Sequence, residues 1–416
     1  VVAADDGIMP QTLEHVAILS MLGLQRGCVV INKVDRVEPE VVQQLQDDVR
    51  RLLQSTFLAQ AAFFMTSSLT GQGVAELKTH LENEAQHVQQ RQENGFFRLA
   101  IDRVFTLEGQ GTVVTGTAYA GVAEAGSDQA VLRLMPQNLP VRVRSIHAQN
   151  TPSAYAKAGQ RCALNIAGVA KNQIERGNWV ADARCFIPAT HVDVRLQLLG
   201  TASTVLKTWV LVHVHIGAAH YVAHVVPLSQ DQVQPEQTAL VQLVFTEAIC
   251  SMPGDRFIVR DAQAKHTIGG GVVLDPNAPD RKRRSIARLS WLDGIENYLQ
   301  GRGLEFLLRQ APYGLEQIFL QRLLGADVTD LVAPVGALWV QSPRSATAKV
   351  LIHQNAWEHL LARIETVLAE AHERYPDEPG VEAARLRRMV APRAPESVWF
   401  GALHELVQRQ RLVLNG

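Results

Sequence analysis

The first 94 residues alternate short apolar runs with stretches whose apolar positions recur every three to four residues. Short apolar runs predict buried strands, and the three-to-four spacing predicts amphipathic helices. This alternation is typical of a parallel sheet covered by helices. The expected strands are Val1–Ala4, Cys28–Asn32 and Ala61–Thr66, and the expected helices are Gln11–Leu22, Glu38–Leu58 and Val74–Ala85. The polar stretch Gln86–Gly95 then marks a linker.

From Phe96 onward the pattern changes to short β-rich runs separated by glycines, which is the signature of all-β barrels. Two such blocks predict one β-barrel over residues 95–184 and a second over 185–275. The expected strands of the first are Phe97–Phe105, Gly111–Tyr119, Val131–Leu134, Val141–His147, Arg161–Ile166 and Asn178–Val180. Those of the second are Val192–Leu198, Trp209–Ile216, Leu240–Phe245, Asp255–Arg260 and Gly269–Leu274.

A helical region follows the basic run Arg281–Arg284 and reaches a β-rich stretch only at Ala337–Gln341. The same order of helices and then a short strand, Leu412–Leu414, recurs from Ala356. Two similar units predict tandem winged-helix modules over residues 280–345 and 350–416.

The composition argues for a globular protein with no bulk basic field. Apolar residues make up 47% of the 416 residues and the net charge is −1, so any RNA contact must come from local patches. The four cysteines lie far apart, which suggests neither a zinc site nor a disulfide framework and fits a reducing cytoplasm. No apolar run approaches the roughly 18 residues of a membrane span, so no membrane partner is expected.

The strongest local motif is Asn32-Lys-Val-Asp35, at the end of an expected strand. A carboxylate accepts two hydrogen bonds and so matches the N1–H and N2–H₂ groups of guanine, whereas adenine would leave it unpaired. Asn32 can reach the N7/O6 edge of the base, and the stem of Lys33 can lie along its plane. The alternative is a loop of solvated charges.

Ser67 and Ser68 follow another expected strand some thirty residues later. A serine-rich turn there can aim backbone N–H groups at guanine O6. The order of strand, NKxD, helix, strand and serine turn is far more specific than either motif alone. The alternative for the two serines is a helix N-cap.

The segment Asp5–His15 (DDGIMPQTLEH) resembles the part that follows switch II in translational GTPases of the elongation factor Tu type. This resemblance implies GTP, GDP and Mg²⁺ as ligands. The chain opens on a strand-like run at Val1, ends on another at Arg411–Gly416 and contains no GxxxxGK(S/T). We therefore expect a chain truncated at both ends that carries no catalytic residue and hydrolyses no GTP itself. His15 is interpreted as a helix residue in a domain contact. The expected fold is multidomain: a partial α/β P-loop-type G domain, two β-barrels and winged-helix modules.

The β-rich blocks resemble the selenocysteine-specific elongation factor family. The matching segments are Phe97–Phe105, Gly109–Gly116, Ile146–Asn150, Ala158–Gly168, Pro253–Asp261 and Thr267–Val272. The resemblance places an aminoacyl pocket at Asp102, Arg103 and Arg161. Two guanidiniums would stabilise an anionic selenolate and be left unpaired by neutral serine. The alternative is a surface ion pair between Asp102 and a neighbouring arginine.

The resemblance implies GTP-dependent delivery of selenocysteyl-tRNA to the ribosome at recoded UGA codons, by a monomer. An mRNA hairpin would be held mainly by a further C-terminal winged helix. Two alternatives stay open: another elongation factor Tu-type GTPase, against which the helical tail speaks, and a non-catalytic RNA-binding adaptor. Four histidines lie close together in the sequence, and we interpret them as packing and hydrogen-bonding residues of a barrel and not as a metal site: His213, His215, His220 and His224. Of the two basic runs, the one at residues 385–388 is the better candidate for contact with RNA.

Overall fold

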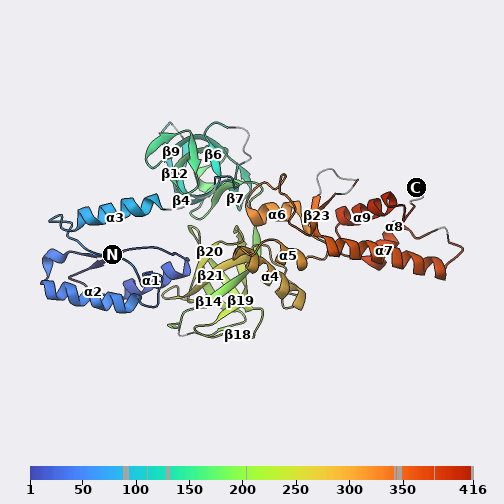
Figure 1. The fold of residues 1–416 in the computed structure, drawn as a ribbon. Helices are drawn as coiled ribbons and strands as arrows, with labels where there is room; N and C mark the ends of the chain where they lie inside the picture. The colour runs from blue at the N-terminus through green and yellow to red at the C-terminus, as the bar shows by residue number, and fades with distance from the viewer. Residues whose placement is uncertain are drawn as a thin grey trace. The chain divides into compact units, whose positions relative to one another are not determined.

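The computed structural model describes residues 1–87, 93–109, 111–127, 132–202, 204–341, 343, 349–378 and 380–413. The chain divides into two compact units. The first contains Val1–Ala183 and Ile187–Ala278, and the second contains Arg184–Phe186 and Pro279–Gly416. Figure 1 shows helices and a small sheet at the N-terminal end, two β-rich bodies after them, and helices at the C-terminal end.

The N-terminal part is a parallel three-stranded sheet in the order β1-β2-β3, as the sequence pattern predicts. Ile31 at its centre is completely buried. The second helix ends at Leu53, five residues before the expected Leu58, because the Thr56 hydroxyl donates to the Leu53 carbonyl and accepts from the Leu58 N–H. The elements are β1 (Val2–Ala3), α1 (Pro10–Met21), β2 (Val29–Asn32), η1 (Val34–Arg36), α2 (Pro39–Leu53), β3 (Phe63–Met65) and α3 (Val74–Gln86).

The first β block is an eight-stranded sheet in the order β10-β9-β12-β5-β4-β13-β7-β8, with β11 and β6 paired beside it. Its buried residues form one core that includes Leu99, Val114 and Leu164. The strands are β4 (Arg98–Leu107), β5 (Gly111–Ala120), β6 (Val122–Glu124), β7 (Leu132–Met135), β8 (Leu139–Pro140), β9 (Arg142–Ala148), β10 (Thr151–Ser153), β11 (Tyr155–Lys157), β12 (Arg161–Ala167) and β13 (Trp179–Asp182). A short 3₁₀ helix, η2 (Lys171–Gln173), precedes β13.

The second β block is a closed barrel in the order β14-β19-β17-β16-β20-β21. Gly271 allows strand packing there, because a Cβ atom would lie 1.9 Å from the Arg195 carbonyl oxygen. The expected strand at Trp209 begins one residue later, since Trp209 has a φ of 69°. The strands are β14 (Ala189–Leu198), β15 (Leu206–Lys207), β16 (Val210–Ile216), β17 (Ala219–Pro227), β18 (Gln232–Val233), β19 (Thr238–Ile249), β20 (Arg256–Arg260) and β21 (Thr267–Asp275).

Polar contacts join the parts of this first unit. Arg98 Nη1 donates to both carboxylate oxygens of Asp255, at 2.8 and 3.0 Å, and its guanidinium lies over Tyr119 and Trp179. On α1, Glu14 accepts from Arg260 and from Thr267 of the closed barrel. These buried or half-buried pairs fix the β blocks and α1 against one another.

The second unit has six helices and a three-stranded sheet within its described residues, in the strand order β22-β24-β23. The strand expected at Ala337–Gln341 is confirmed, but two short strands were missed because runs of two and five residues carry little periodicity. The strand expected at Leu412–Leu414 is wrong for Leu412 and Val413, and Leu414 lies outside the described residues.

The helices of this unit bury Trp357 and Trp399 in one core. The elements are α4 (Ile286–Leu299), α5 (Glu305–Arg309), β22 (Leu315–Glu316), α6 (Gln317–Leu324), β23 (Ala337–Gln341), β24 (Lys349–His353), α7 (Gln354–Arg374), α8 (Ala383–Val390) and α9 (Glu396–Gln408).

Candidate functional site

The loop after β2 carries the candidate guanine-binding residues. Asn32 closes the strand, and Lys33 turns the chain with left-handed backbone angles, φ 62° and ψ 32°. A non-glycine residue rarely adopts this conformation, and such strain gathers at functional sites. The short helix η1 follows and carries Asp35 as an exposed residue.

The two predicted motifs meet in space. Asn32 is 3.2 Å from the Ser68 hydroxyl through Nδ2 and accepts from Thr66 Oγ1 at 3.1 Å. Parallel pairing of β2 with β3 causes this meeting, because the carboxyl ends of both strands lie at one edge of the sheet. Thr66 was not predicted as a site residue, although its position directly after β3 could have indicated that it lies at the same edge of the sheet.

Ser67 and Ser68 have different surroundings. Ser67 is fully buried, and its Oγ accepts from the Thr70 N–H at 3.1 Å, so its side chain builds the turn. Ser68 is exposed, and no hydrogen bond recorded among the described residues uses the N–H of Ser68 or Leu69. The N-cap alternative is wrong, since α3 begins at Val74 with Gly73 as its N-cap.

Asp5 holds both cations that flank Asp35. Lys33 Nζ lies 2.9 and 3.1 Å from the Asp5 carboxylate oxygens, and Arg36 Nη1 lies 3.0 Å from one of them. The hydrogen bond from Lys33 keeps the pKa of Asp5 below its ordinary value, and Asp5 in turn raises the pKa of Lys33. Across the described part of the chain, no recorded hydrogen bond or ion pair involves the Asp35 carboxylate.

The candidate aminoacyl residues lie on two strands separated by β5. Arg161 on β12 makes a two-pronged contact with Asp102 on β4, through Nη1 to Oδ2 and through Nη2 to Oδ1 at 3.2 Å. Thr115 on β5 donates to Asp102 at 2.8 Å. Partial burial opposes ionisation of Asp102, but the hydrogen bonds from Arg161 and Thr115 keep its pKa below the ordinary value.

Arg103 lies beside this pair without a recorded hydrogen bond or ion pair among the described residues. A register shift between Ile101 and Arg103 marks a bulge in β4, which is why two successive residues serve one site. The Arg103 charge also lowers the pKa of Asp102. Asp102 neutralises Arg161, so Arg103 supplies the excess positive charge of the cluster.

Three of the four clustered histidines come together on the outer face of the closed barrel. His213 Nδ1 lies 2.7 Å from His220 Nε2, and the His215 and His220 rings stack at 4.8 Å. His224 lies apart, edge-on to Trp209. Burial, with the nearby His220 and Arg260 charges, lowers the pKa of His215 to about 4. Among the residues with described positions, no group of three His, Cys, Asp or Glu side chains could hold a metal ion.

His15 is an exposed residue of α1, and the recorded polar contacts from this helix to the barrel come from its neighbour Glu14. The expected domain contact therefore exists one residue earlier than predicted. Since side chains along a helix rotate by about 100° per residue, the sequence indicated the helix but not which of two adjacent polar residues faces the barrel.

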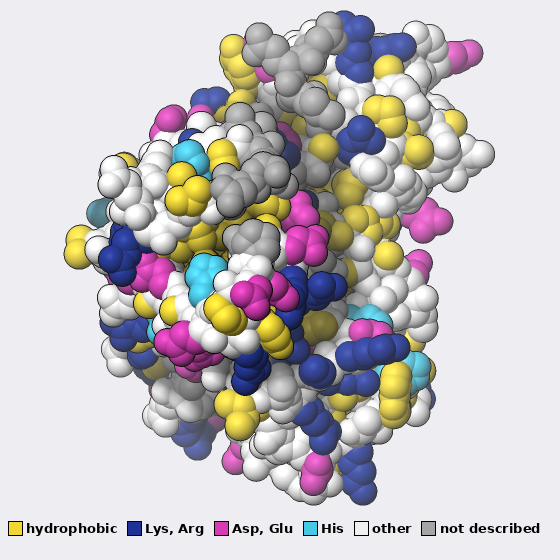
Figure 2. Space-filling view, turned by 90° about the vertical axis from the view of Figure 1, so that its right-hand side faces the viewer, with side chains coloured by type: hydrophobic (Ala, Val, Ile, Leu, Met, Phe, Trp, Pro, Cys, Tyr) yellow, Lys and Arg dark blue, Asp and Glu magenta, His cyan; other side chains and the backbone are white. Residues whose placement is uncertain are grey.

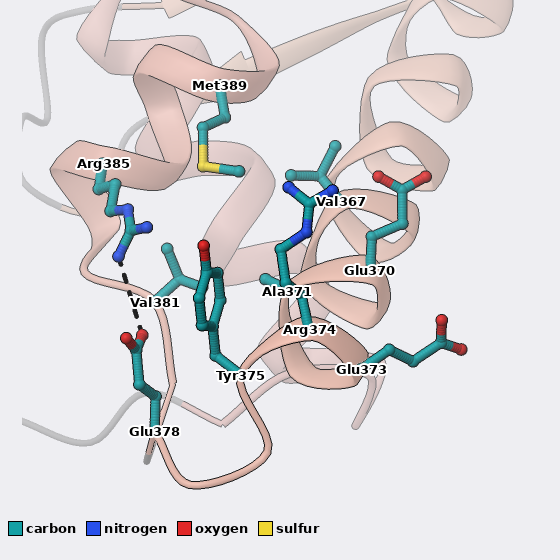
Figure 3. A pocket seen from close by; sticks show the side chains of 10 residues that line it. All are labelled: Val367, Glu370, Ala371, Glu373, Arg374, Tyr375, Glu378, Val381, Arg385 and Met389. Atoms are coloured by element: carbon teal, nitrogen blue, oxygen red, sulfur yellow. Dashed lines mark ion pairs between the residues drawn. The ribbon is translucent and has the colours of Figure 1, made fainter.

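The second unit has a pocket of about 430 Å³ between the end of α7 and α8. Figure 3 shows Tyr375 at its centre, with Arg385 beside it and Met389 above. Arg385 pairs with Glu378 at 3.8 Å, and Arg387 pairs with Glu396 at 3.6 Å, so two arginines of the predicted basic run are partly neutralised. Figure 2 shows Lys and Arg side chains gathered in the lower part of the face that it draws, with fewer acidic side chains among them.

Family models match four segments of the chain. Residues 1–87 match the elongation factor Tu GTP binding domain, and residues 111–181 match elongation factor Tu domain 2. Residues 185–280 match the β-barrel domain of selenocysteine-specific elongation factor, and residues 366–416 match the winged helix of elongation factor SelB.

Curated relatives agree with these models. The selenocysteine-specific elongation factor of Escherichia coli (strain K12) is 36% identical over 403 residues, which cover 96% of this chain and 61% of that protein. Over nearly all of its length, the chain is similar to selenocysteine-specific elongation factors. The Haemophilus influenzae relative of the same name is 31% identical over 99% of this chain and 64% of its own length. The chain thus spans under two thirds of either protein.

Solved structures show the same fold. A bacterial selenocysteine-specific elongation factor EF-Sec superposes with a TM-score of 0.76 over 98% of this chain and 64% of its own, at 21% identity. Elongation factor SelB from Methanococcus maripaludis, apo form, superposes with a TM-score of 0.60 over 65% of this chain and 63% of its own, at 26% identity. These likenesses confirm the predicted fold class. No described helix is long and apolar enough to span a bilayer.

Proposed function

We propose that the chain is part of a GTPase that delivers selenocysteyl-tRNA to the ribosome at recoded UGA codons. The observation that carries the nucleotide assignment is the exposed Asp35 carboxylate, which has no recorded partner among the described residues. It follows β2 within a loop fixed by Asn32 and Ser68. A carboxylate held free in this way suits the paired donors of guanine.

The guanine end of the site comprises Asn32, Lys33, Asp35, Ser67 and Ser68. Asn32 is held by Thr66 and Ser68 where it can meet the N7/O6 edge, and Ser67 shapes the turn that presents the Ser68 N–H. Hydrolysis of GTP is phosphoryl transfer to water, and Mg²⁺ neutralises phosphate charge in such sites. The 416 residues contain no GxxxxGK(S/T), so we propose that they hydrolyse no GTP by themselves.

The aminoacyl end comprises Asp102, Arg103 and Arg161. The ion pair between Asp102 and Arg161 agrees with the surface-ion-pair alternative, since Arg161 is half exposed. The position of Arg103 beside that pair adds a net positive charge, which favours an anionic side chain over a neutral one. We therefore propose a selenolate pocket in which Arg103 supplies the main attractive charge and the Asp102–Arg161 ion pair forms one side.

Selenocysteyl-tRNA, the ribosome and an mRNA hairpin are the proposed partners, and the cytoplasm is the proposed location of a monomeric protein. We also retain the domain bounds 1–94, 95–184, 185–275, 280–345 and 350–416 as a proposal. The match of residues 366–416 to a SelB winged helix favours this function over elongation factor Tu.

The test uses a chimaera in which the part of the Escherichia coli relative that precedes its match is joined to Val1. We expect Asp35→Asn to weaken GTP binding by about 1.5–3 kcal/mol and to strengthen binding of xanthosine triphosphate, because an amide offers a donor where guanine needs an acceptor. Titration of both nucleotides measures this change. Glu38→Gln, an exposed acid just beyond η1, serves as the control. Unchanged GTP affinity in Asp35→Asn would refute the guanine site.

A further inference from the structure

Two cations close to Asp35 in the sequence could compete with guanine for its carboxylate. Lys33 lies two residues before it and Arg36 lies directly after it. Either cation is near enough in sequence to pair with the Asp35 carboxylate. An ion pair of this kind would occupy the oxygens that the guanine N1–H and N2–H₂ groups need, so nucleotide binding would first have to break it.

The structure shows both cations turned to another carboxylate. Asp5 receives Lys33 at 2.9 and 3.1 Å and Arg36 at 3.0 Å. The Asp5 side chain is 25% exposed, compared with 61% for Arg36, so the anchoring group is the better shielded member of the cluster. Asp35 remains exposed and without a recorded partner among the residues described.

The parallel sheet explains why Asp5 is in this position. Ala3 on β1 is in register with Asn32 on β2, and the Ala4 N–H donates to the Asn32 carbonyl at 2.8 Å. Asp5 therefore leaves β1 at the same edge where Lys33 leaves β2. At this edge Lys33 has left-handed backbone angles, and its Nζ binds the Asp5 carboxylate.

We propose that Asp5 is a positioning residue that keeps the Asp35 carboxylate free for guanine by occupying Lys33 and Arg36. Asp5 does not touch the base in this account. Its removal frees both cations to pair with Asp35, and guanine nucleotides then compete with an internal ion pair. The inference rests on the proposed function, because it presumes that Asp35 is the guanine acceptor.

The experiment measures the dissociation constant of GDP for the chimaera carrying Asp5→Asn, Arg36→Gln, or both substitutions. We expect Asp5→Asn to weaken GDP binding about three- to fivefold, the range of a single exposed ion pair. Adding Arg36→Gln to Asp5→Asn should restore part of the parent's GDP affinity, because one of the two freed cations is removed. Raising the KCl concentration should shrink the Asp5→Asn effect, since salt screens exposed pairs.

Asp6→Asn is the matched control, because Asp6 meets only Lys33, at 3.4 Å, and is 59% exposed. An unchanged GDP dissociation constant in Asp5→Asn, or an Asp5→Asn defect that Arg36→Gln does not relieve even in part, overturns the inference. Either result leaves the proposed function intact if Asp35→Asn still alters nucleotide choice. If Asp35→Asn has no effect, the guanine site and this inference fall together. Equal melting temperatures of the parent and Asp5→Asn exclude a folding defect as the cause.

Discussion

Substituting Arg161 with alanine tests how the site on the first β block distinguishes charged from neutral side chains. In the parent, Asp102 and Arg161 cancel and Arg103 leaves a net charge of about +1. In Arg161→Ala, the Asp102 carboxylate is no longer neutralised and offsets Arg103 instead. The local charge then falls to about zero, so an anionic aminoacyl group loses its attraction.

The expected size follows from Coulomb's law. A unit charge acting at roughly 8 Å with an effective dielectric constant of about 20 contributes about 2 kcal/mol. Arg161 is 52% exposed, so solvent screening should reduce this figure to about 1 kcal/mol. We therefore expect Arg161→Ala to speed selenocysteyl-tRNA dissociation about fivefold. Release of seryl-tRNA should change little, because its side chain is neutral.

The assay follows dissociation of both charged tRNAs from the GTP-bound chimaera at fixed salt, because contacts to phosphate also depend on salt. Arg133→Ala is the control, since Arg133 lies on β7 and donates to the Asn138 carbonyl, away from the Asp102 pair. Arg103→Ala should give a loss similar to that of Arg161→Ala. If Arg161→Ala weakens both tRNAs equally, Arg161 is a general tRNA or structural contact and the charge-reading argument is wrong.

Two further predictions concern stability. Trp399 is 1% exposed in the core of the second unit, so Trp399→Ala should destabilise that unit by about 3–5 kcal/mol in a chemical denaturation curve, and a loss below about 1 kcal/mol would contradict the packing described. Because the pKa of His215 falls from 6.5 to about 4 on folding, the unfolded chain binds more protons between these values, and stability should drop as pH falls through this window. His215→Asn should flatten this drop, and a slope equal to that of the parent would contradict the assignment.

Much of the fold was predictable because periodicity and motif order report on local structure. Strand–helix alternation gave the parallel layer, and glycine-broken β runs gave the two β blocks. The helix end at Leu53 was missed because it depends on one threonine hydroxyl that bonds to nearby backbone. The strand β24 was missed because it is a five-residue run that becomes a strand by pairing with β23.

The residues of the candidate site also differ in how far the sequence alone predicts them. The motif predicts Asn32 and Asp35 as site residues, since their chemistry is read directly from residue type and spacing. The roles of Asp5 and Thr66 depend on which strands are neighbours, and a sequence does not state the strand order of a sheet. Asp102 and Arg161 are 59 residues apart, and only the adjacency of β12, β5 and β4 shows that they form one ion pair.

The central claim is tested most directly by comparing how tightly the chimaera holds selenocysteyl-tRNA and seryl-tRNA in its GTP and GDP forms. The account predicts slow dissociation of selenocysteyl-tRNA in the GTP form, and fast dissociation of seryl-tRNA in both forms. Adding ATP in place of GTP should not slow release of selenocysteyl-tRNA, because adenine offers Asp35 no pair of donors. Equal retention of the two tRNAs, or retention that does not depend on GTP, would contradict the account.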